Sequence, residues 1–123
     1  MFGITADHIV DSFEPGLDLA TMSSRVILGS SSVIEQVRPD VLVVQGDTTS
    51  ACMAGLAAFY QGVPVVHLEA GLRTGDLRNP FPEEANRAIL GRLAELHLAP
   101  TRSAKENLLR EGVPEEAIRV IGN

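Results

Sequence analysis

The sequence has few residues that could form disulfides or an aromatic core: one cysteine, no tryptophan and 4% aromatic residues among 123. The single thiol, Cys52, excludes an intrachain disulfide. A core with so few rings must consist of Val, Leu, Ile and Ala, which is typical of parallel sheets covered by helices. The most apolar stretch, 54–72, is interrupted by Gln61, Pro64 and Glu69, so no segment reaches the ~20 apolar residues of a membrane span.

Positive charge is also scarce. Lys and Arg number 10 against 16 Asp and Glu, which gives a net charge of −6 and a pI of about 4.9. Nucleic acids and anionic membranes bind clustered Lys and Arg, so neither is an expected partner. The first residues also lack the basic segment, apolar run and cleavage site of a secretory signal. We therefore expect a cytoplasmic globular protein.

Helical and strand-like segments alternate along the chain. The strand candidates are short, apolar and bounded by Gly, Pro or Asp. Helices are expected over 17–37, 50–60, about 85–96 and from a cap at Thr101 or Ser103 to 112, and strands over 40–45, 64–68, 97–99 and 118–121. The second helix is expected to follow a cap among Asp47, Thr48 and Thr49. This alternation favours an α/β fold with a parallel sheet, right-handed crossovers and helices on both faces. A length of 123 residues suits one domain rather than two.

Two details of the helices follow from their residues. The Gly-Ser-Ser-Ser run at 29–32 consists of poor helix formers, so a kink or local fraying is expected within the first helix. The third helix has an apolar stripe, which predicts its buried face. The stripe consists of Ala85, Ala88, Ile89, Leu93 and Leu96.

Acidic residues stand where open parallel sheets bind ligands, at the carboxyl ends of the strands. Asp47 follows the first strand, Glu69 follows the second, and Glu83 opens the helix after the next loop. Local patterns also allow structural roles, because Asp47 can cap a helix, and Glu83 and Glu84 can complement a helix dipole. Glu69 has no such role, and burying a carboxylate without purpose is costly. We expect Asp47, Glu69 and Glu83 to converge on one edge of the sheet.

Motifs for several other chemistries are incomplete or absent from the sequence. His67 and Glu69 have the His-x-Glu spacing of zinc deaminases, but that site needs a Pro-Cys-x-x-Cys partner, so no metal is expected. Dinucleotide-binding, Walker and nucleophile-elbow glycine motifs are not found. Arg73, Arg78 and Arg87 surround the loop after the second strand, where they can pair with phosphate or with the carboxylates themselves.

Three strings taken together resemble the non-hydrolysing UDP-N-acetylglucosamine 2-epimerases. They are Gln-Gly-Asp-Thr-Thr-Ser at 45–50, His-Leu-Glu-Ala-Gly-Leu-Arg-Thr-Gly-Asp at 67–76, and Pro-Phe-Pro-Glu-Glu-Ala-Asn-Arg at 80–87. Their order and spacing are those of the family, and the resemblance extends over essentially the whole chain. It implies one Rossmann-like half of a glycosyltransferase-B-type fold, in which two such domains enclose the active site.

The resemblance also implies a reaction and its residues. The family interconverts UDP-N-acetylglucosamine and UDP-N-acetylmannosamine by anti elimination of UDP to a 2-acetamidoglucal and re-addition of UDP, without a nicotinamide or any other cofactor. By position, Asp47, Glu69 and Glu83 match its acidic catalytic residues, and the division of acid and base roles among them stays open. The residues expected to bind the UDP-sugar are Thr48, Arg73 and Arg87.

The chain is expected to be part of a larger enzyme. Family members begin with another strand and a Gly-Thr-Arg-Pro-Glu loop, and they continue into a second domain with most of the UDP contacts and a catalytic histidine. Residues 1–123 then form a single incomplete Rossmann-like domain without the UDP-binding domain. We expect the chain alone to lack epimerase activity and to bind UDP-sugars weakly. An exposed sheet edge predicts a homo-oligomer or aggregation, and the complete enzyme is expected to be a dimer.

Two alternatives stay open at this point. The first is another enzyme of the same architecture, such as a hydrolysing nucleotide-sugar epimerase or a glycosyltransferase-like enzyme, which would differ in its products. The second is a non-catalytic fragment that binds a partner through its exposed sheet edge.

Overall fold

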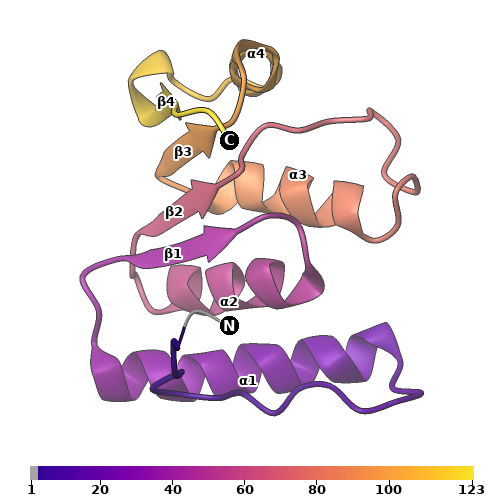
Figure 1. Ribbon diagram of the computed structural model, residues 1–123, viewed down its shortest axis with the longest axis vertical. Helices are drawn as coiled ribbons and strands as arrows, with labels where there is room; N and C mark the ends of the chain where they lie inside the picture. The colour runs from indigo at the N-terminus through magenta and orange to yellow at the C-terminus, as the bar shows by residue number, and fades with distance from the viewer. Residues whose placement is uncertain (1–2) are drawn as a thin grey trace.

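Four short parallel strands form one sheet in the structure, a computed structural model that describes residues 3–123 (Figure 1). The strands lie next to one another in chain order, as β1 (Leu42–Gln45), β2 (Val65–Leu68), β3 (Leu96–Ala99) and β4 (Ile118–Val120). The helices are α1 (Leu19–Val37), α2 (Thr49–Tyr60), α3 (Glu83–Leu93) and α4 (Arg102–Arg110), and a 3-10 turn, Glu115–Ala117, precedes β4. The predicted α/β fold with a parallel sheet is confirmed, and most predicted bounds agree within two residues.

Three of the helices begin at capping side chains. The side chains of Asp18, Thr48 and Thr101 accept hydrogen bonds from backbone N–H groups in the first turns of α1, α2 and α4, at 3.0, 3.1 and 3.1 Å. Of the two candidates for α4, Thr101 is therefore the cap. No helix within residues 3–123 is both long and apolar enough to cross a membrane.

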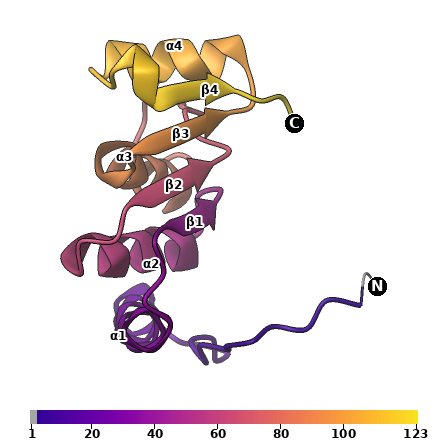
Figure 2. The ribbon, with the colours of Figure 1, turned by 90° about the vertical axis from the view of Figure 1, so that its left-hand side faces the viewer.

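Burial alternates along the strands because the crossover helices cover one face of the sheet. Sequential parallel strands joined by right-handed crossovers place α2, α3 and α4 on the same face. Val44, His67 and His97 point toward these helices and are buried, whereas Val43 on the opposite face is 57% exposed. Figure 2 shows the strands side by side, with α1 beyond α2 and away from the sheet. Within residues 3–123, the second face of the sheet has no helical cover, so the helices expected on both faces are seen on one face in this part of the chain.

We expect the isolated chain to self-associate through this open face and the neighbouring edge of β1. β1 and β4 are the sheet edges within the described residues, and exposed strand edges pair readily with other chains. Val43→Lys should lower the average mass measured by sedimentation velocity at a fixed concentration, because a charge on this face opposes its burial. Leu28→Lys is the control, since Leu28 is 71% exposed on α1. A wild-type chain that stays monomeric at every concentration would contradict this expectation.

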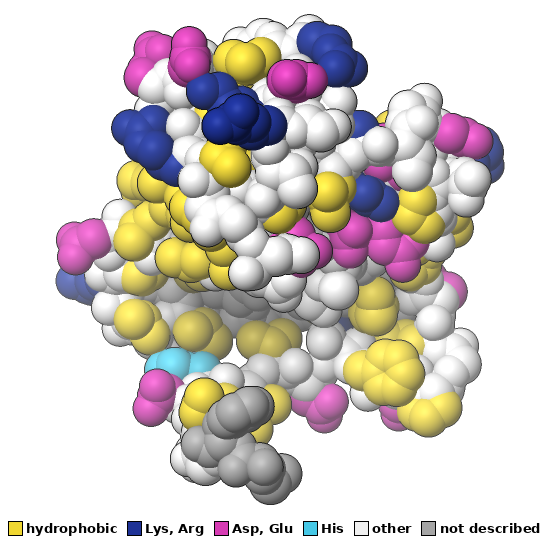
Figure 3. Space-filling view, turned by 45° about the horizontal axis from the view of Figure 1, so that its top comes forward, with side chains coloured by type: hydrophobic (Ala, Val, Ile, Leu, Met, Phe, Trp, Pro, Cys, Tyr) yellow, Lys and Arg dark blue, Asp and Glu magenta, His cyan; other side chains and the backbone are white. Residues whose placement is uncertain are grey.

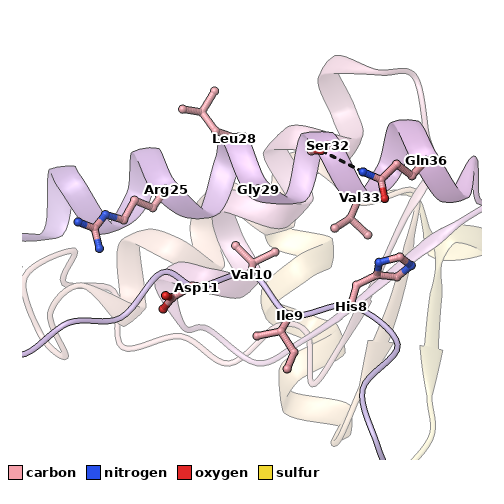
Figure 4. Close-up of a pocket in the computed structure, with 10 residues that line it drawn as sticks. All are labelled: His8, Ile9, Val10, Asp11, Arg25, Leu28, Gly29, Ser32, Val33 and Gln36. Carbon is pink, nitrogen blue, oxygen red and sulfur yellow. Dashed lines mark hydrogen bonds between the residues drawn. The ribbon is translucent and has the colours of Figure 1, made fainter.

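The Gly-Ser run of α1 does not interrupt the helix. α1 is continuous through residues 29–32, so the fraying predicted there is wrong. Gly29 instead permits a close approach, because a Cβ atom at this position would collide with Cγ1 of Val10. Figure 4 shows Val10 facing the helix at Gly29, beside a cavity of about 520 Å³ between residues 8–11 and α1.

The buried face of α3 differs from the predicted apolar stripe. Ile89, which the stripe included, is 41% exposed. Leu96, also assigned to the stripe, lies in β3. The buried residues of α3 are Glu84, Asn86, Arg87, Leu90 and Gly91. The stripe prediction is wrong because α3 turns polar side chains toward the ends of β1 and β2, where they find partners.

Candidate active site

Asp47 lies in the turn between β1 and α2. Its neighbour Thr48 accepts the hydrogen bond from the Ala51 amide at 3.1 Å, so Thr48 fills the capping role that was open for Asp47. The Asp47 side chain is 34% exposed, and its Oδ2 lies 3.5 Å from Nε of Arg87. Asn86 Nδ2 donates to the backbone carbonyl of Asp47 at 2.9 Å. α3 therefore holds both the backbone and the side chain of Asp47.

Glu69 follows β2 directly and has a left-handed backbone conformation, with φ of 67°. Residues other than glycine rarely adopt this conformation, and those that do are common at functional sites. Gln45 Nε2 donates to Oε2 of Glu69 at 2.5 Å. The same oxygen lies 3.6 Å from the position that a Cβ atom would occupy on Gly46, the residue before Asp47. A cavity of about 220 Å³ extends from Gln45 and Glu69 to Pro100.

Glu84 joins the loop after β2 to α3. Its Oε1 accepts hydrogen bonds from the backbone N–H groups of Thr74 and Gly75, both at 3.0 Å. Its Oε2 lies 3.2 Å from Nε of Arg87, and the Glu84 side chain is only 2% exposed. Arg87 thus lies between two carboxylates, those of Glu84 and Asp47. Of the two roles predicted for Arg87, pairing with the carboxylates is the one seen in this structure.

Glu83 is the half-buried first residue of α3. No hydrogen bond or ion pair within residues 3–123 joins it to Asp47 or Glu69. The structure therefore brings Asp47 and Glu69 to neighbouring strand ends, and it places Glu83 beside Glu84 at the start of the helix that holds Asp47. Convergence of all three predicted carboxylates around a ligand stays a prediction.

Arg73 is engaged by a carboxylate far along the chain. Its Nε and Nη2 donate to Oε1 and Oε2 of Glu111 at 2.7 and 2.9 Å. Its Nη1 donates to the backbone carbonyl of Leu72 at 2.8 Å, and the Arg73 side chain is 9% exposed. This guanidinium ties the loop after β2 to the end of α4. Binding of a phosphate by Arg73 would require the ion pair with Glu111 to open.

Two histidines lie in register on β2 and β3, on the face that the helices cover. His67 and His97 are each 1% exposed. Burial lowers the pKa of His67, and burial together with the repulsion that a protonated His67 would exert lowers the pKa of His97 to about 4. Both rings are therefore neutral near pH 7. Within residues 3–123, no group of three or more His, Cys, Asp or Glu side chains is placed to hold a metal ion, so His67 has no neighbouring ligands with which to bind one.

The carboxyl edge of the sheet gathers charged groups of both signs. On the side of the molecule seen in Figure 3, acidic side chains cluster beside a basic one. Asp47 and Glu69 follow neighbouring strands, and the amino end of α2 begins beside Asp47. Carboxylates accept and deliver protons, and the N–H groups of a helix amino end bind phosphate. The arrangement suits proton transfer on a phosphate-bearing ligand.

Sequence reasoning assigned no part in the site to three side chains that support this edge, namely Gln45, Glu84 and Asn86. A signal for Glu84 was present, because the spacing of Glu84 and Arg87 brings opposite charges together on a helix. Gln45 and Asn86 gave no such signal. Their partners lie 24 and 39 residues away in the chain, so only the fold brings them together.

Comparisons with known proteins agree on one family. The family model described as UDP-N-acetylglucosamine 2-epimerase matches residues 1–123. The UDP-N-acetylglucosamine 2-epimerase of Yersinia pestis is 50% identical over all 123 residues, which correspond to 33% of that protein. The enzyme of the same name from Escherichia coli K12 is 46% identical over the same length and is also covered to 33%. The chain therefore spans about a third of the length of these relatives.

Solved structures show the same similarity. The UDP-GlcNAc 2-epimerase from Neisseria meningitidis, bound to UDP-GlcNAc, superimposes with a TM-score of 0.94 at 44% identity, over 98% of this chain and 32% of that one. The enzyme from Methanocaldococcus jannaschii, in complex with UDP-GlcNAc and UDP, gives 0.84 at 38% identity, over 88% of this chain and 29% of that one. These neighbours confirm the predicted Rossmann-like half of a glycosyltransferase-B-type fold. Because the family model covers its whole length, this chain belongs to the UDP-N-acetylglucosamine 2-epimerase family.

Proposed function

We propose that this chain supplies the acid–base half of an active site that interconverts UDP-N-acetylglucosamine and UDP-N-acetylmannosamine. The observation that carries the proposal is the position of Asp47 and Glu69 at the ends of neighbouring strands, in a chain that matches the family throughout. Relatives with solved structures bind UDP-GlcNAc, which supports a UDP-sugar as the ligand.

In the proposed reaction a carboxylate removes the proton from C2 of the sugar. The electron pair of the C–H bond forms a double bond between C2 and C1, and the bond from C1 to oxygen breaks, so that UDP leaves with its electron pair. Re-addition of UDP to the 2-acetamidoglucal and return of a proton to the opposite face of C2 complete the epimerisation. The proposal assigns these proton transfers to Asp47, Glu69 and Glu83, and no external cofactor is needed for the balance.

The residues proposed to bind the substrate differ in whether their polar groups are already paired within the protein. Thr48 stands at the amino end of α2, where N–H groups and the helix dipole favour a phosphate. Arg87 acts on the substrate mainly by orienting Asp47, with which it is already paired. Arg73 contributes only if its ion pair with Glu111 opens.

The proposal extends to the rest of the enzyme. Residues 1–123 form one Rossmann-like domain, and a second domain carries most contacts to UDP. The complete enzyme is a homo-oligomer in the cytoplasm. A cytoplasmic location is consistent with a free thiol at the sole cysteine, Cys52. This side chain is buried, and burial raises the pKa of its thiol to about 11.

A chimera tests the function directly. Residues 1–123 would replace the matching third of the Yersinia pestis relative, and the products formed from UDP-N-acetylglucosamine would be identified by proton NMR and anion-exchange chromatography. We expect the chimera to form UDP-N-acetylmannosamine, and the purified 123-residue chain to form none.

The products separate the alternatives. Release of UDP and free sugar would indicate a hydrolysing enzyme instead. A chimera that folds and binds UDP-sugar but forms no product would point to a non-catalytic chain. Turnover by the 123-residue chain alone would show that the proposed division of the site between two domains is wrong.

A further inference from the structure

The turn that presents Asp47 is fastened to β2 at two consecutive residues. Gly46 has a φ of 73°, and its backbone N–H donates to the carbonyl of Leu68 at 3.0 Å. The carbonyl oxygen of Gly46 lies 2.8 Å from Nε2 of His67. Each contact is one residue away from a carboxylate, since Gly46 precedes Asp47 and Leu68 precedes Glu69. The spacing between the two carboxylates thus depends on how Gly46 is held against β2.

The contact with Gly46 fixes the protonation of the His67 ring. A carbonyl oxygen only accepts hydrogen bonds, so Nε2 of His67 must carry the hydrogen. Nδ1 is buried and has no hydrogen-bond partner within residues 3–123. A proton on Nδ1 would therefore be left without an acceptor, and the ring is neutral with its hydrogen on Nε2.

We propose that His67 is a positioning residue, which sets the distance between the carboxylates of Asp47 and Glu69 by donating from Nε2 to the carbonyl of Gly46. His67 is 1% exposed and does not line the cavity beside Glu69. It therefore acts through the turn and does not touch the substrate. The inference deepens the proposed function and rests on it for its effect on turnover.

His97 provides a matched control within the chain. It lies in register with His67 on the next strand and is equally buried, and its Nδ1 also has no hydrogen-bond partner in the described part of the chain. Its strand, β3, pairs with β2 and β4 but not with β1, so His97 is not adjacent to the Gly46 turn. Replacing His97 disturbs the same layer of the core without removing the contact to Gly46.

The test compares His67→Gln with His67→Met. Gln places its Nε2 the same number of bonds from the backbone as His does and keeps a donor, whereas Met has similar length and no donor. In the chimera we expect His67→Met to lower kcat by up to about 10²-fold with little change in KM, as for a misplaced catalytic group. His67→Gln should restore most of this loss, and His97→Met should leave kcat near the wild-type value. Equal kcat values for the Gln and Met variants of His67 would overturn the proposal.

A second measurement does not depend on turnover. In the 123-residue chain, long-range proton–nitrogen NMR spectra should show His67 with its hydrogen on Nε2. The chemical shifts of the carboxyl carbons of Asp47 and Glu69 should change in His67→Met but not in His97→Met. A ring with its hydrogen on Nδ1, or a charged ring at pH 7, would overturn the proposal even if His67→Met failed to fold. An inactive wild-type chimera would refute the proposed function alone, and these spectra would still decide the role of His67.

Discussion

Asp47→Asn in the active chimera is expected to lower kcat by about 10²- to 10⁴-fold, the range that a positioned acid or base contributes. Asn has the shape of Asp but cannot take up a proton at neutral pH. The side chain is 34% exposed and its charged partner Arg87 keeps its ion pair with Glu84, so the variant should fold. The measurement is the initial rate of UDP-N-acetylmannosamine formation at saturating substrate.

Glu69→Gln should cause a loss in the same range, because Glu69 stands at the neighbouring strand end. Asp40→Asn and Glu95→Gln are matched controls, since these exposed acids precede β1 and β3 at the opposite edge of the sheet. Both controls should retain the wild-type rate. If Asp47→Asn and Glu69→Gln were as active as these controls, the carboxylates would have no part in the chemistry.

Glu84→Ala is expected to destabilise the 123-residue chain by about 3–5 kcal/mol, the usual effect of removing one partner of a buried ion pair. The substitution leaves the buried Arg87 with the partly exposed Asp47, at 3.5 Å, as its ion-pair partner. It also leaves the N–H groups of Thr74 and Gly75 without their acceptor. The free energy of unfolding would be measured by urea denaturation followed by circular dichroism.

Glu83→Ala is the control for this loss. Glu83 precedes Glu84 in the same helical turn, but it makes no ion pair within residues 3–123. We expect Glu83→Ala to change stability by less than about 1 kcal/mol. The loss expected for Glu84→Ala can unfold a marginally stable domain. Glu84→Gln therefore provides an intermediate case, which keeps an acceptor for Thr74 and Gly75 but loses the charge facing Arg87. Equal stabilities for the three variants would show that Glu84 does not clamp the loop.

Much of the fold could be predicted from the sequence because its signals are local. Short apolar runs ended by Gly, Pro and Asp gave the strands, and capping residues such as Thr48 and Thr101 gave helix starts. The parallel topology then placed Asp47 and Glu69 at the same edge of the sheet. The buried face of α3 could not be predicted in this way. Its orientation depends on polar contacts with Asp47 and with the loop at 74–75, as well as on the burial of Leu90 in the core.

The sequence by itself determined the order of the elements, the class of fold and the strand ends that carry carboxylates, because periodicity and capping act within a few residues. Only the tertiary structure decided the partners: Glu84 rather than Glu83 turned inward, Arg73 tied to Glu111, and His67 bound to Gly46. These pairs depend on how helices are rotated against strands and on contacts up to 38 residues apart. Such distances lie beyond the reach of any local pattern, since hydrogen bonds and ion pairs form only where packing brings their atoms within a few ångströms.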